Sequence, residues 1–233
     1  MLEINDITVQ FGGVRPLDDV TLHFKQGVSG LVGPNGAGKT TMLNVVSGFV
    51  TPVKGSVIFD GTDLLHLAPA KRAKWGLRRT FQQEQVIQEL SAVDNLRLAA
   101  DNLGAPAGSV EKALEFVGLQ DPGRLATNLN MLERRLVEIG KVVIGDPKVV
   151  ALDEPGAGLS EDDSKVLVPL IKRIADEYGA TVVLIDHDMD LVKTVCTEIA
   201  VLDFGKRIAF GPTAEVLADP IVKKAYLGVE DVA

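Results

Sequence analysis

The run from Gly33 to Thr41, which reads Gly-Pro-Asn-Gly-Ala-Gly-Lys-Thr-Thr, constrains the fold more than any other part of the sequence. Its spacing, Gly-x-x-x-x-Gly-Lys-Thr, is that of a phosphate-binding loop (P-loop). Glycine lets the backbone turn tightly and direct several N–H groups at one point, where they can hold the β- and γ-phosphates of a nucleotide. Lys39 adds the positive charge that phosphates require, and the Thr40 hydroxyl can bind Mg²⁺.

The residues on either side of the loop support this interpretation. Residues 30–32 are typical of the end of a buried strand, and residues 41–46 are typical of the first turns of a helix, whose N-terminus favours anions. The alternative is a glycine-rich turn before a helix, with no ligand. The residues expected to contact the nucleotide are Gly33, Pro34, Asn35, Gly36, Ala37, Gly38, Lys39, Thr40 and Thr41.

The composition limits the classes of partner. The chain has 233 residues, 46% of them hydrophobic, which is enough for one large domain or two small lobes. Its net charge of −8 disfavours a nucleic-acid partner. Cys196 is the lone cysteine and has apolar neighbours, so we expect a buried thiol and a reducing compartment. We find no signal-peptide pattern at the N-terminus and no apolar run long enough to span a bilayer, so any membrane role is expected to come through a partner.

Hydrophobic periodicity divides the chain into three parts. Residues 2–24 alternate between apolar and polar, and residues 56–59 form another short strand pattern, so we expect antiparallel strands. Helical spacing dominates from about 65 to 145, with a loop predicted at 102–109.

The third part carries the pattern of a parallel sheet. Residues 148–152 and 181–185 are nearly continuous runs of apolar, mostly β-branched residues, as in strands covered on both faces. The helix predicted between them, over 162–178, would connect them as a β-α-β crossover.

Acidic residues follow the first of these buried strands. Asp153 and Glu154 would stand at the carboxyl end of a central strand, where open α/β sheets bind ligands. Asp153 would hold Mg²⁺ directly or through water, and Glu154 would orient and deprotonate an attacking water. His187 follows the next strand and could contact the γ-phosphate and that water. The alternatives are a solvated turn for the acids and an ordinary turn residue for His187.

Together these motifs make the chain resemble an ATP-binding cassette (ABC) ATPase subunit over essentially its whole length. Residues 79–83, Arg-Thr-Phe-Gln-Gln, resemble the family's Q-loop, which implies that Gln82 senses Mg²⁺ and the attacking water and couples the nucleotide to membrane subunits. Residues 156–160 resemble the D-loop, which crosses the dimer interface. Phe11 matches the aromatic position that stacks on adenine; the alternative is a core phenylalanine.

The resemblance implies a P-loop α/β fold with a mainly parallel core sheet, an antiparallel β subdomain and an inserted helical lobe. It would form a single nucleotide-binding domain, with a catalytic lobe at 1–80 and 146–233 and a helical lobe at 81–145. The activity would be ATP hydrolysis, with ATP and Mg²⁺ bound. The expected catalytic residues are Glu154, His187 and Gln82, and the expected Mg²⁺ residues are Thr40, Gln82 and Asp153.

Further segments resemble one subfamily, the branched-chain amino acid importers. They are Phe11-Gly12-Gly13, residues 74–82 and the tail at 219–228. Lipopolysaccharide-export ATPases have a similar tail, and a generic amphipathic helix is the alternative for it. The resemblance implies a cytoplasmic subunit, peripheral on the inner face of the membrane, that works with permease subunits and an extracytoplasmic substrate-binding protein. A nucleotide-binding switch with poor hydrolysis and a soluble ABC ATPase outside transport are the other candidates.

The chain departs from the family at the signature sequence, Leu-Ser-Gly-Gly-Gln. At the matching positions, 129–133, Asn130 replaces the serine, while Met131 and Leu132 replace both glycines. Leucine offers no donor and blocks a close approach of the backbone to phosphate, and Glu133 is expected to bring a negative charge close to the anion. Because each ATP in this family lies between the P-loop of one subunit and the signature of the other, we expect a heterodimer with a second ABC ATPase subunit rather than a homodimer.

An apolar group follows the Q-loop. Val86, Ile87 and Leu90 lie in a segment that is otherwise polar, which suggests a contact site for a permease. The alternative is that these side chains pack on the helical lobe.

Overall fold

The computed structural model describes residues 1–227, so the end of the predicted tail, from Gly228, lies outside the described residues. One sheet is antiparallel, as the alternation in the first part of the chain predicts. Its strands follow the order β2-β1-β4-β5. Their bounds are β1 Leu2–Phe11, β2 Val14–Phe24, β4 Lys54–Phe59 and β5 Thr62–Asp63.

The second sheet forms the centre of the molecule and is parallel from β9 to β6, with β10 added antiparallel at one edge. Its strands, in spatial order, are β10 Lys206–Pro212, β9 Glu198–Asp203, β3 Gly27–Val32, β8 Thr181–Ile185, β7 Val149–Asp153 and β6 Leu77–Arg79. The pattern of continuous burial predicted β7 and β8 closely, and every residue of these two strands is buried.

Side chains of the central strands alternate between two apolar clusters, one on each face of the sheet. On β7, Val150 and Leu152 join the cluster that includes helices α6 (Glu161–Tyr178) and α7 (Met189–Val195). Val149 and Ala151 join the cluster that includes α1 (Lys39–Ser47) and the antiparallel sheet. Because successive side chains of a strand point to opposite faces, neighbouring residues of β7 pack against different helices.

The crossover between β7 and β8 is α6, as predicted. The Ser160 hydroxyl begins this helix by accepting a hydrogen bond of 3.1 Å from the backbone N–H of Asp163. Gly179 ends it in a left-handed conformation, with φ of 63°. The carboxyl ends of β3, β7 and β8 therefore lie on one edge of the sheet, where the predicted site residues follow them.

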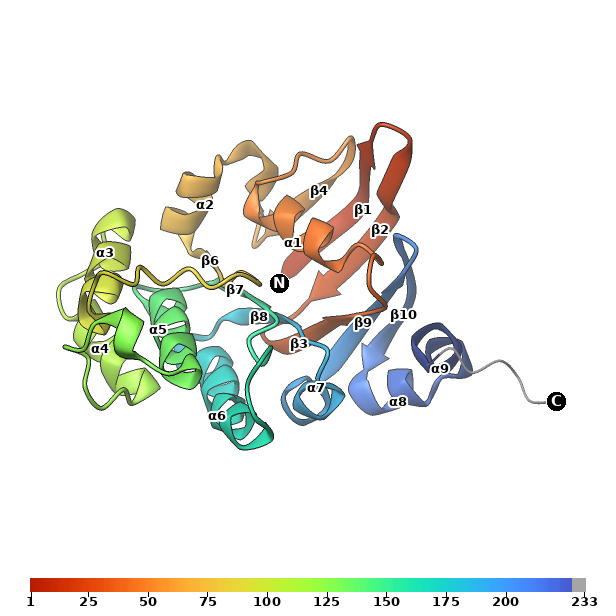
Figure 1. The fold of residues 1–233 in the computed structure, drawn as a ribbon. Helices are drawn as coiled ribbons and strands as arrows, with labels where there is room; N and C mark the ends of the chain where they lie inside the picture. The colour runs from red at the N-terminus through yellow and green to blue at the C-terminus, as the bar shows by residue number, and fades with distance from the viewer. Residues whose placement is uncertain (228–233) are drawn as a thin grey trace.

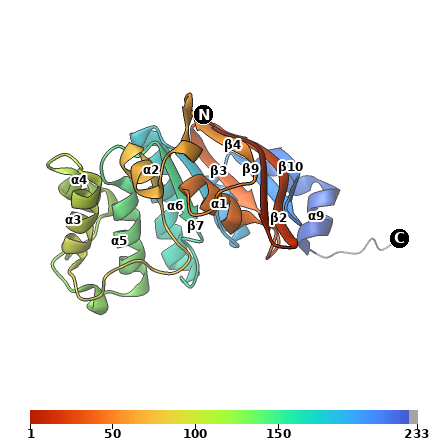
Figure 2. The same ribbon diagram turned by 90° about the horizontal axis from the view of Figure 1, so that it is seen from above.

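Three helices gather at the end of the molecule away from the antiparallel sheet (Figures 1 and 2). They are α3 (Ala92–Leu103), α4 (Ser109–Val117) and α5 (Met131–Val143). The remaining helices are α2 (Pro69–Trp75), the short η1 (Leu64–His66) and η2 (Ala126–Asn128), and α8 (Thr213–Ala218) and α9 (Pro220–Leu227) near the C-terminus. Within residues 1–227, no helix combines the length and the apolar character needed to cross a membrane.

Candidate functional site

The loop at 33–41 joins β3 to α1 in conformations that need glycine. Gly33, Gly36 and Gly38 have φ values of 149°, 80° and 105°, which other residues rarely adopt. A Cβ at Gly38 would also lie within 2.8 Å of the Leu17 side chain on β2. Glycine at this position therefore serves both the turn and the close approach of the neighbouring strand.

The side chain of Lys39 folds back into the loop. Its Nζ donates hydrogen bonds to the carbonyl oxygens of Gly33 (2.7 Å) and Pro34 (2.9 Å), and the residue is only 7% exposed. Burial lowers the pKa of Lys39, while the negative charges of Glu154 and Asp153 act in the opposite direction. The ammonium is largely removed from water, so its charge is costly unless an anion pairs with it. A phosphate bound at the loop would supply that close negative charge.

The carboxylate of Asp153 has one free oxygen. Its Oδ2 accepts a hydrogen bond of 2.8 Å from Nη2 of Arg79, and its backbone N–H donates to the Thr80 hydroxyl at 3.0 Å. Its Oδ1 is buried without a hydrogen-bond partner. A buried carboxylate oxygen without a partner calls for a cation or a donor, so this residue fits an Mg²⁺ ion held jointly with Thr40, which is exposed in the first turn of α1.

The three residues predicted to be catalytic lie together. Glu154 stands between the other two: its Oε2 accepts from Nε2 of Gln82 at 3.2 Å, and its Oε1 lies 3.1 Å from Nε2 of His187. The backbone of Glu154 adopts φ of 53°, and its N–H donates to the carbonyl oxygen of Ile185 at 2.7 Å. The Glu154 carboxylate is thereby held at the junction of β7 and β8.

Phe11 lies at the end of β1, where the hairpin to β2 begins, and it pairs with Val14 across that hairpin. Its ring is not in the core: Phe11 is 55% exposed, and Val14 is 67% exposed. An exposed ring at a hairpin tip can receive a flat aromatic base.

The segment that departs from the family signature forms the start of α5. The Asn130 side chain accepts a hydrogen bond of 2.8 Å from the Glu133 N–H, and the Glu133 carboxylate accepts one of 2.8 Å from the Asn130 N–H. Glu133 also accepts two hydrogen bonds from Arg124, of 2.9 and 2.8 Å. The pKa of Glu133 is lowered, first by the Asn130 N–H and then by Arg124.

Glu133 was expected to bring a negative charge close to the anion; in the structure Arg124 pairs with it at 2.8 Å, so this charge is compensated within the chain. The expected difference at the two glycine positions remains. Met131 is 48% exposed and lies beside Gly158, while Leu132 is half-buried against the apolar core. Both side chains occupy space that a glycine would leave open.

Sequence reasoning gave no role to Arg79, although this residue organises the site. Besides its pair with Asp153, its Nη1 donates to Oδ1 of Asn44 at 2.7 Å, and its guanidinium lies 4.9 Å from the centre of the Phe81 ring. Asn44 is one turn after Thr40 on α1. No local pattern in the sequence identifies this role, because the partner Asp153 lies 74 positions away.

Comparison with known proteins agrees with this geometry. A family model described as "ABC transporter" matches residues 17–157, and one described as "Branched-chain amino acid ATP-binding cassette transporter" matches residues 206–232. The branched-chain amino acid transport ATP-binding protein BraF of Pseudomonas aeruginosa is 36% identical, and LivG of Escherichia coli K12 is 32% identical; each alignment covers 98% of both chains.

Solved structures give the same result. A crystal structure of an ATP-binding cassette of an ABC transporter in its ADP conformation superposes with a TM-score of 0.87 at 30% identity, covering 98% of this chain and 99% of that one. A nucleotide-free cassette gives 0.87 at 29% identity, with 99% of both chains covered. The P-loop, the strand-end acids and these full-length relatives lead to one conclusion: the chain belongs to the ATP-hydrolysing, ATP-binding subunits of ABC transporters.

Proposed function

We propose that this ATPase powers an importer of branched-chain amino acids or a similar polar metabolite. The observation that carries the proposal is the Gln82–Glu154–His187 cluster beside a complete P-loop, in a chain aligned end to end with the subunits BraF and LivG. The ATPase would act on the inner face of the membrane, where permease subunits would hold it. An extracytoplasmic substrate-binding protein would deliver the transported molecule to those permease subunits. The catalytic lobe of the ATPase would comprise 1–80 and 146–233, and its helical lobe 81–145.

The geometry suggests how the side chains divide the work of hydrolysis. Lys39 and the backbone N–H groups of the loop would hold the phosphates, with Phe11 against the base. Glu154, kept in place by Gln82 and His187 on either side, would take the proton of the attacking water. Thr40, Gln82 and Asp153 would hold Mg²⁺, which supplies positive charge to the phosphate oxygens.

We propose a heterodimer as the working form. The P-loop half of this chain is complete, whereas the start of α5 presents Met131 and Leu132 in place of two glycines. A partner with an intact signature would complete the P-loop site of this chain. The same departure supports the second candidate, a subunit that binds ATP but hydrolyses it poorly in both sites.

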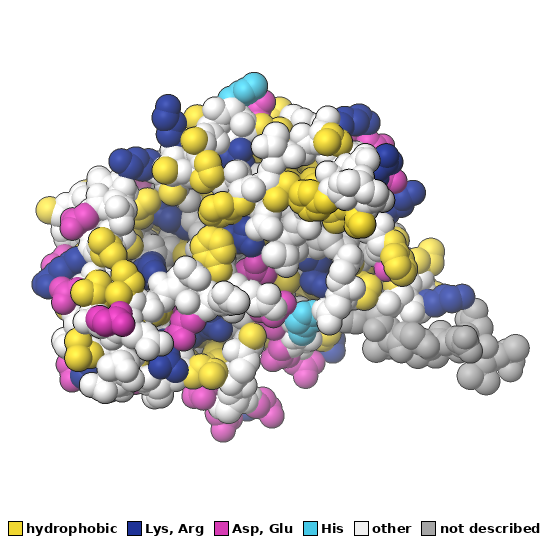
Figure 3. Space-filling model, turned by 45° about the horizontal axis from the view of Figure 1, so that its top comes forward, with side chains coloured by type: hydrophobic (Ala, Val, Ile, Leu, Met, Phe, Trp, Pro, Cys, Tyr) yellow, Lys and Arg dark blue, Asp and Glu magenta, His cyan; other side chains and the backbone are white. Residues whose placement is uncertain are grey.

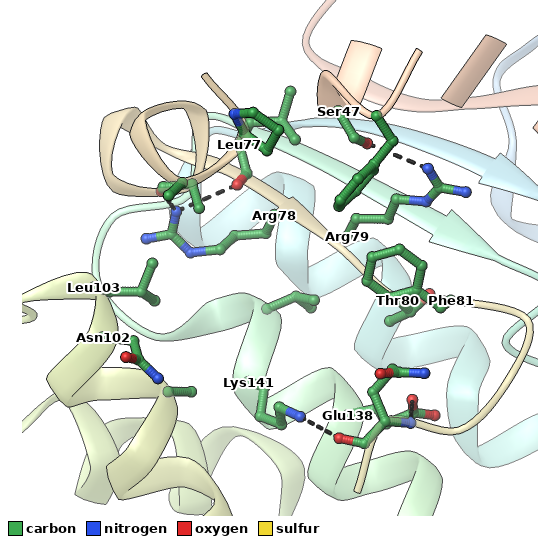
Figure 4. A pocket seen from close by; sticks show the side chains of 17 residues that line it. Ser47, Leu77, Arg78, Arg79, Thr80, Phe81, Asn102, Leu103, Glu138 and Lys141 are labelled. Carbon is green, nitrogen blue, oxygen red and sulfur yellow. Dashed lines mark hydrogen bonds between the residues drawn. The ribbon is translucent and has the colours of Figure 1, made fainter. Parts of the chain in front are cut away.

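A cavity between the central sheet and the helical end is the proposed docking place for a permease segment. Its volume is about 470 Å³, and its lining includes Phe49, Arg79 and Phe81 as well as Glu138 and Lys141 of α5 (Figure 4). On the face of the molecule that Figure 3 shows, hydrophobic, acidic and basic side chains are mixed. Because Arg79 and Phe81 of the Q-loop line this cavity, a permease segment bound there would affect the nearby cluster of Gln82, Glu154 and His187.

The apolar group after the Q-loop divides between two roles. Val86 is half-buried and packs against the small cluster of Ala92, Ala126, Leu129 and Val137, as the alternative interpretation of this segment held. Ile87 is 40% exposed. We therefore assign Ile87 a second permease contact, outside the cavity, and a cysteine at this position is expected to crosslink to a permease loop.

Uptake in cells tests the proposed function. Deleting the gene should abolish high-affinity uptake of radiolabelled leucine, isoleucine and valine, and the parent chain should restore it. Glu154→Gln should not restore uptake although it assembles with the same membrane subunits. Normal uptake in the deletion strain would refute the assigned substrate class.

A further inference from the structure

One face of α5 carries a buried ion pair. Arg135 is 7% exposed and Glu138 is 3% exposed, and Nη1 of Arg135 donates to Oε2 of Glu138 at 2.6 Å. A buried pair of this kind gives little net stability unless further hydrogen bonds satisfy both groups. The further hydrogen bonds of these two residues lead away from α5 to two loops.

The first loop is the one that carries Gln82. The backbone N–H of Gln85 donates to Oε1 of Glu138 at 3.0 Å, and Nζ of Lys141 donates to the carbonyl oxygen of Gln85 at 2.5 Å. Glu138 and Lys141 project from α5 on the same side of the cavity in Figure 4. Both backbone groups of Gln85, three residues after Gln82, are therefore fixed by one helix.

The second loop is the one that follows Glu154. Nη2 of Arg135 donates to the carbonyl oxygen of Ala157 at 3.5 Å, and the N–H of Ala157 donates to the carbonyl oxygen of Glu154 at 3.1 Å. The contact from Arg135 is long for a hydrogen bond, so it is weaker than the contact from Glu138. It still places a guanidinium N–H against the turn that holds Glu154.

We propose that Arg135 and Glu138 are positioning residues that hold the side chains of Gln82 and Glu154 within hydrogen-bonding distance of each other. The pair ties together the two loops whose side chains meet at the 3.2 Å hydrogen bond between Gln82 and Glu154. This inference rests on the proposed catalytic roles of those two residues. A polar network that satisfies all its members holds one arrangement much better than an apolar contact would.

The Arg135–Glu138 pair lies close to the signature segment at the start of α5. Arg135 is five residues from Asn130, about 8 Å along a helix. The start of α5 is the segment proposed to face the nucleotide of the partner subunit. A shift of this helix on nucleotide binding would therefore displace both loops together, so that each composite site affects the geometry of the other.

Variants of the pair separate positioning from nucleotide binding. In the complex that co-purifies with the full-length chain, Glu138→Ala and Arg135→Met should lower kcat by about ten- to a hundredfold and change the Kd for Mg²⁺-ATP by less than about twofold. The binding loop is not touched by either change. Glu138→Gln should recover part of the rate, since an amide oxygen can still accept from the Gln85 N–H.

A matched control is the pair Arg173–Glu177 on α6, whose Nε and Oε1 atoms lie 2.5 Å apart on the exposed surface. Glu177→Ala should leave kcat and Kd unchanged. Unchanged kcat in Glu138→Ala, or losses of kcat and ATP affinity of equal size, would overturn the proposal.

Hydrogen exchange of the nucleotide-free chain gives a readout that does not depend on catalysis. Amides at 83–87 and at 156–159 should both exchange faster in Glu138→Ala and in Arg135→Met than in the parent. Faster exchange in only one of the two loops would refute the link between them. Failure of the catalytic assignment would be recognised separately, by full turnover in Glu154→Gln with the exchange pattern intact.

Discussion

At the scale of single residues, the buried Lys39 ammonium bears most directly on nucleotide binding. Replacing Lys39 with alanine removes a charge-assisted contact worth roughly 1.5–3 kcal/mol, so the affinity for Mg²⁺-ATP should fall about ten- to a hundredfold. Calorimetry measures this directly. Lys54→Ala, which removes an exposed ammonium paired with Asp19, is the control and should bind ATP as the parent does. Equal affinity in the Lys39 variant would refute the phosphate contact.

Glu154 allows a test of the chemical step. Glu154→Gln keeps the shape of the side chain and its contacts but cannot take a proton, so the variant should bind ATP normally and hydrolyse it far more slowly. A closed dimer should accumulate when ATP is present, which sedimentation can detect. Glu111→Gln, an exposed change on α4, should behave like the parent. Parental hydrolysis by the Glu154 variant in the full complex would exclude this residue as the base.

Glu138 makes the stability of the fold depend on pH. Burial is the largest cause that raises the pKa of Glu138, and the Gln85 N–H and the charge of Arg135 only partly offset it. Only at a pH between the ordinary and the raised pKa does the folded chain hold a proton on Glu138 that the unfolded chain has released. The stability gained from that proton is present below the ordinary carboxyl pKa and is lost as the pH rises through the higher folded value.

Denaturant titrations at a series of pH values test whether the free energy of unfolding falls as the pH rises. The free energy of unfolding of the parent, relative to that of Glu138→Gln, should decline as the pH rises from the ordinary carboxyl pKa through the higher folded pKa of Glu138. An advantage of the parent that grows with pH over this range would show that the pKa of Glu138 is lowered instead.

At the scale of elements, we propose that the start of α5 determines whether this chain can complete the nucleotide site of another subunit. Changing Asn130→Ser, Met131→Gly and Leu132→Gly together should raise the ATPase rate of the isolated chain, because the serine hydroxyl and a close backbone approach to phosphate are restored. The same change should lower stability by about 2 kcal/mol or more, since two glycines enter the first turn and Leu132 leaves its place against the core. The rate per folded molecule must therefore be measured beside the melting temperature. No increase in that rate would mean that the segment tolerates its leucine.

The elements that the sequence predicts well are those whose signal is local. Runs of buried residues identify β7 and β8, and the helix predicted over 162–178 between them corresponds to α6. Strand β6 was missed because two of its three residues, Arg78 and Arg79, are arginines. Their burial depends on distant partners: carbonyl oxygens for Arg78 and the Asp153 carboxylate for Arg79.

In the functional site, too, residues within one continuous segment could be predicted and contacts between distant segments could not. The P-loop is one continuous segment, so its residues could be named from spacing alone. The pair of Glu133 with Arg124 and the pair of Arg79 with Asp153 join separate segments, the latter across 74 positions. Such contacts arise from packing of the chain and leave no periodic pattern in the sequence. For this reason Glu133 resembled an unpaired charge in the sequence although it is neutralised in the fold.

At the scale of the whole molecule, the central claim is that this ATPase works as one half of an asymmetric pair. Its P-loop motif is complete and Gln82, Glu154 and His187 lie together, while its signature segment lacks both glycines. Losing one preorganised donor at a developing charge typically costs about 10²- to 10³-fold in rate. A homodimer would carry that loss in both sites, and a heterodimer in only one.

Steady-state ATPase activity of the purified chain, compared with that of the complex isolated with it from membranes, tests this claim most directly. We expect weak hydrolysis by the chain alone and turnover at least about tenfold faster in the complex, abolished there by Glu154→Gln. Brisk turnover by the isolated, unmodified chain, at a rate that its partners do not raise, would contradict the asymmetric heterodimer.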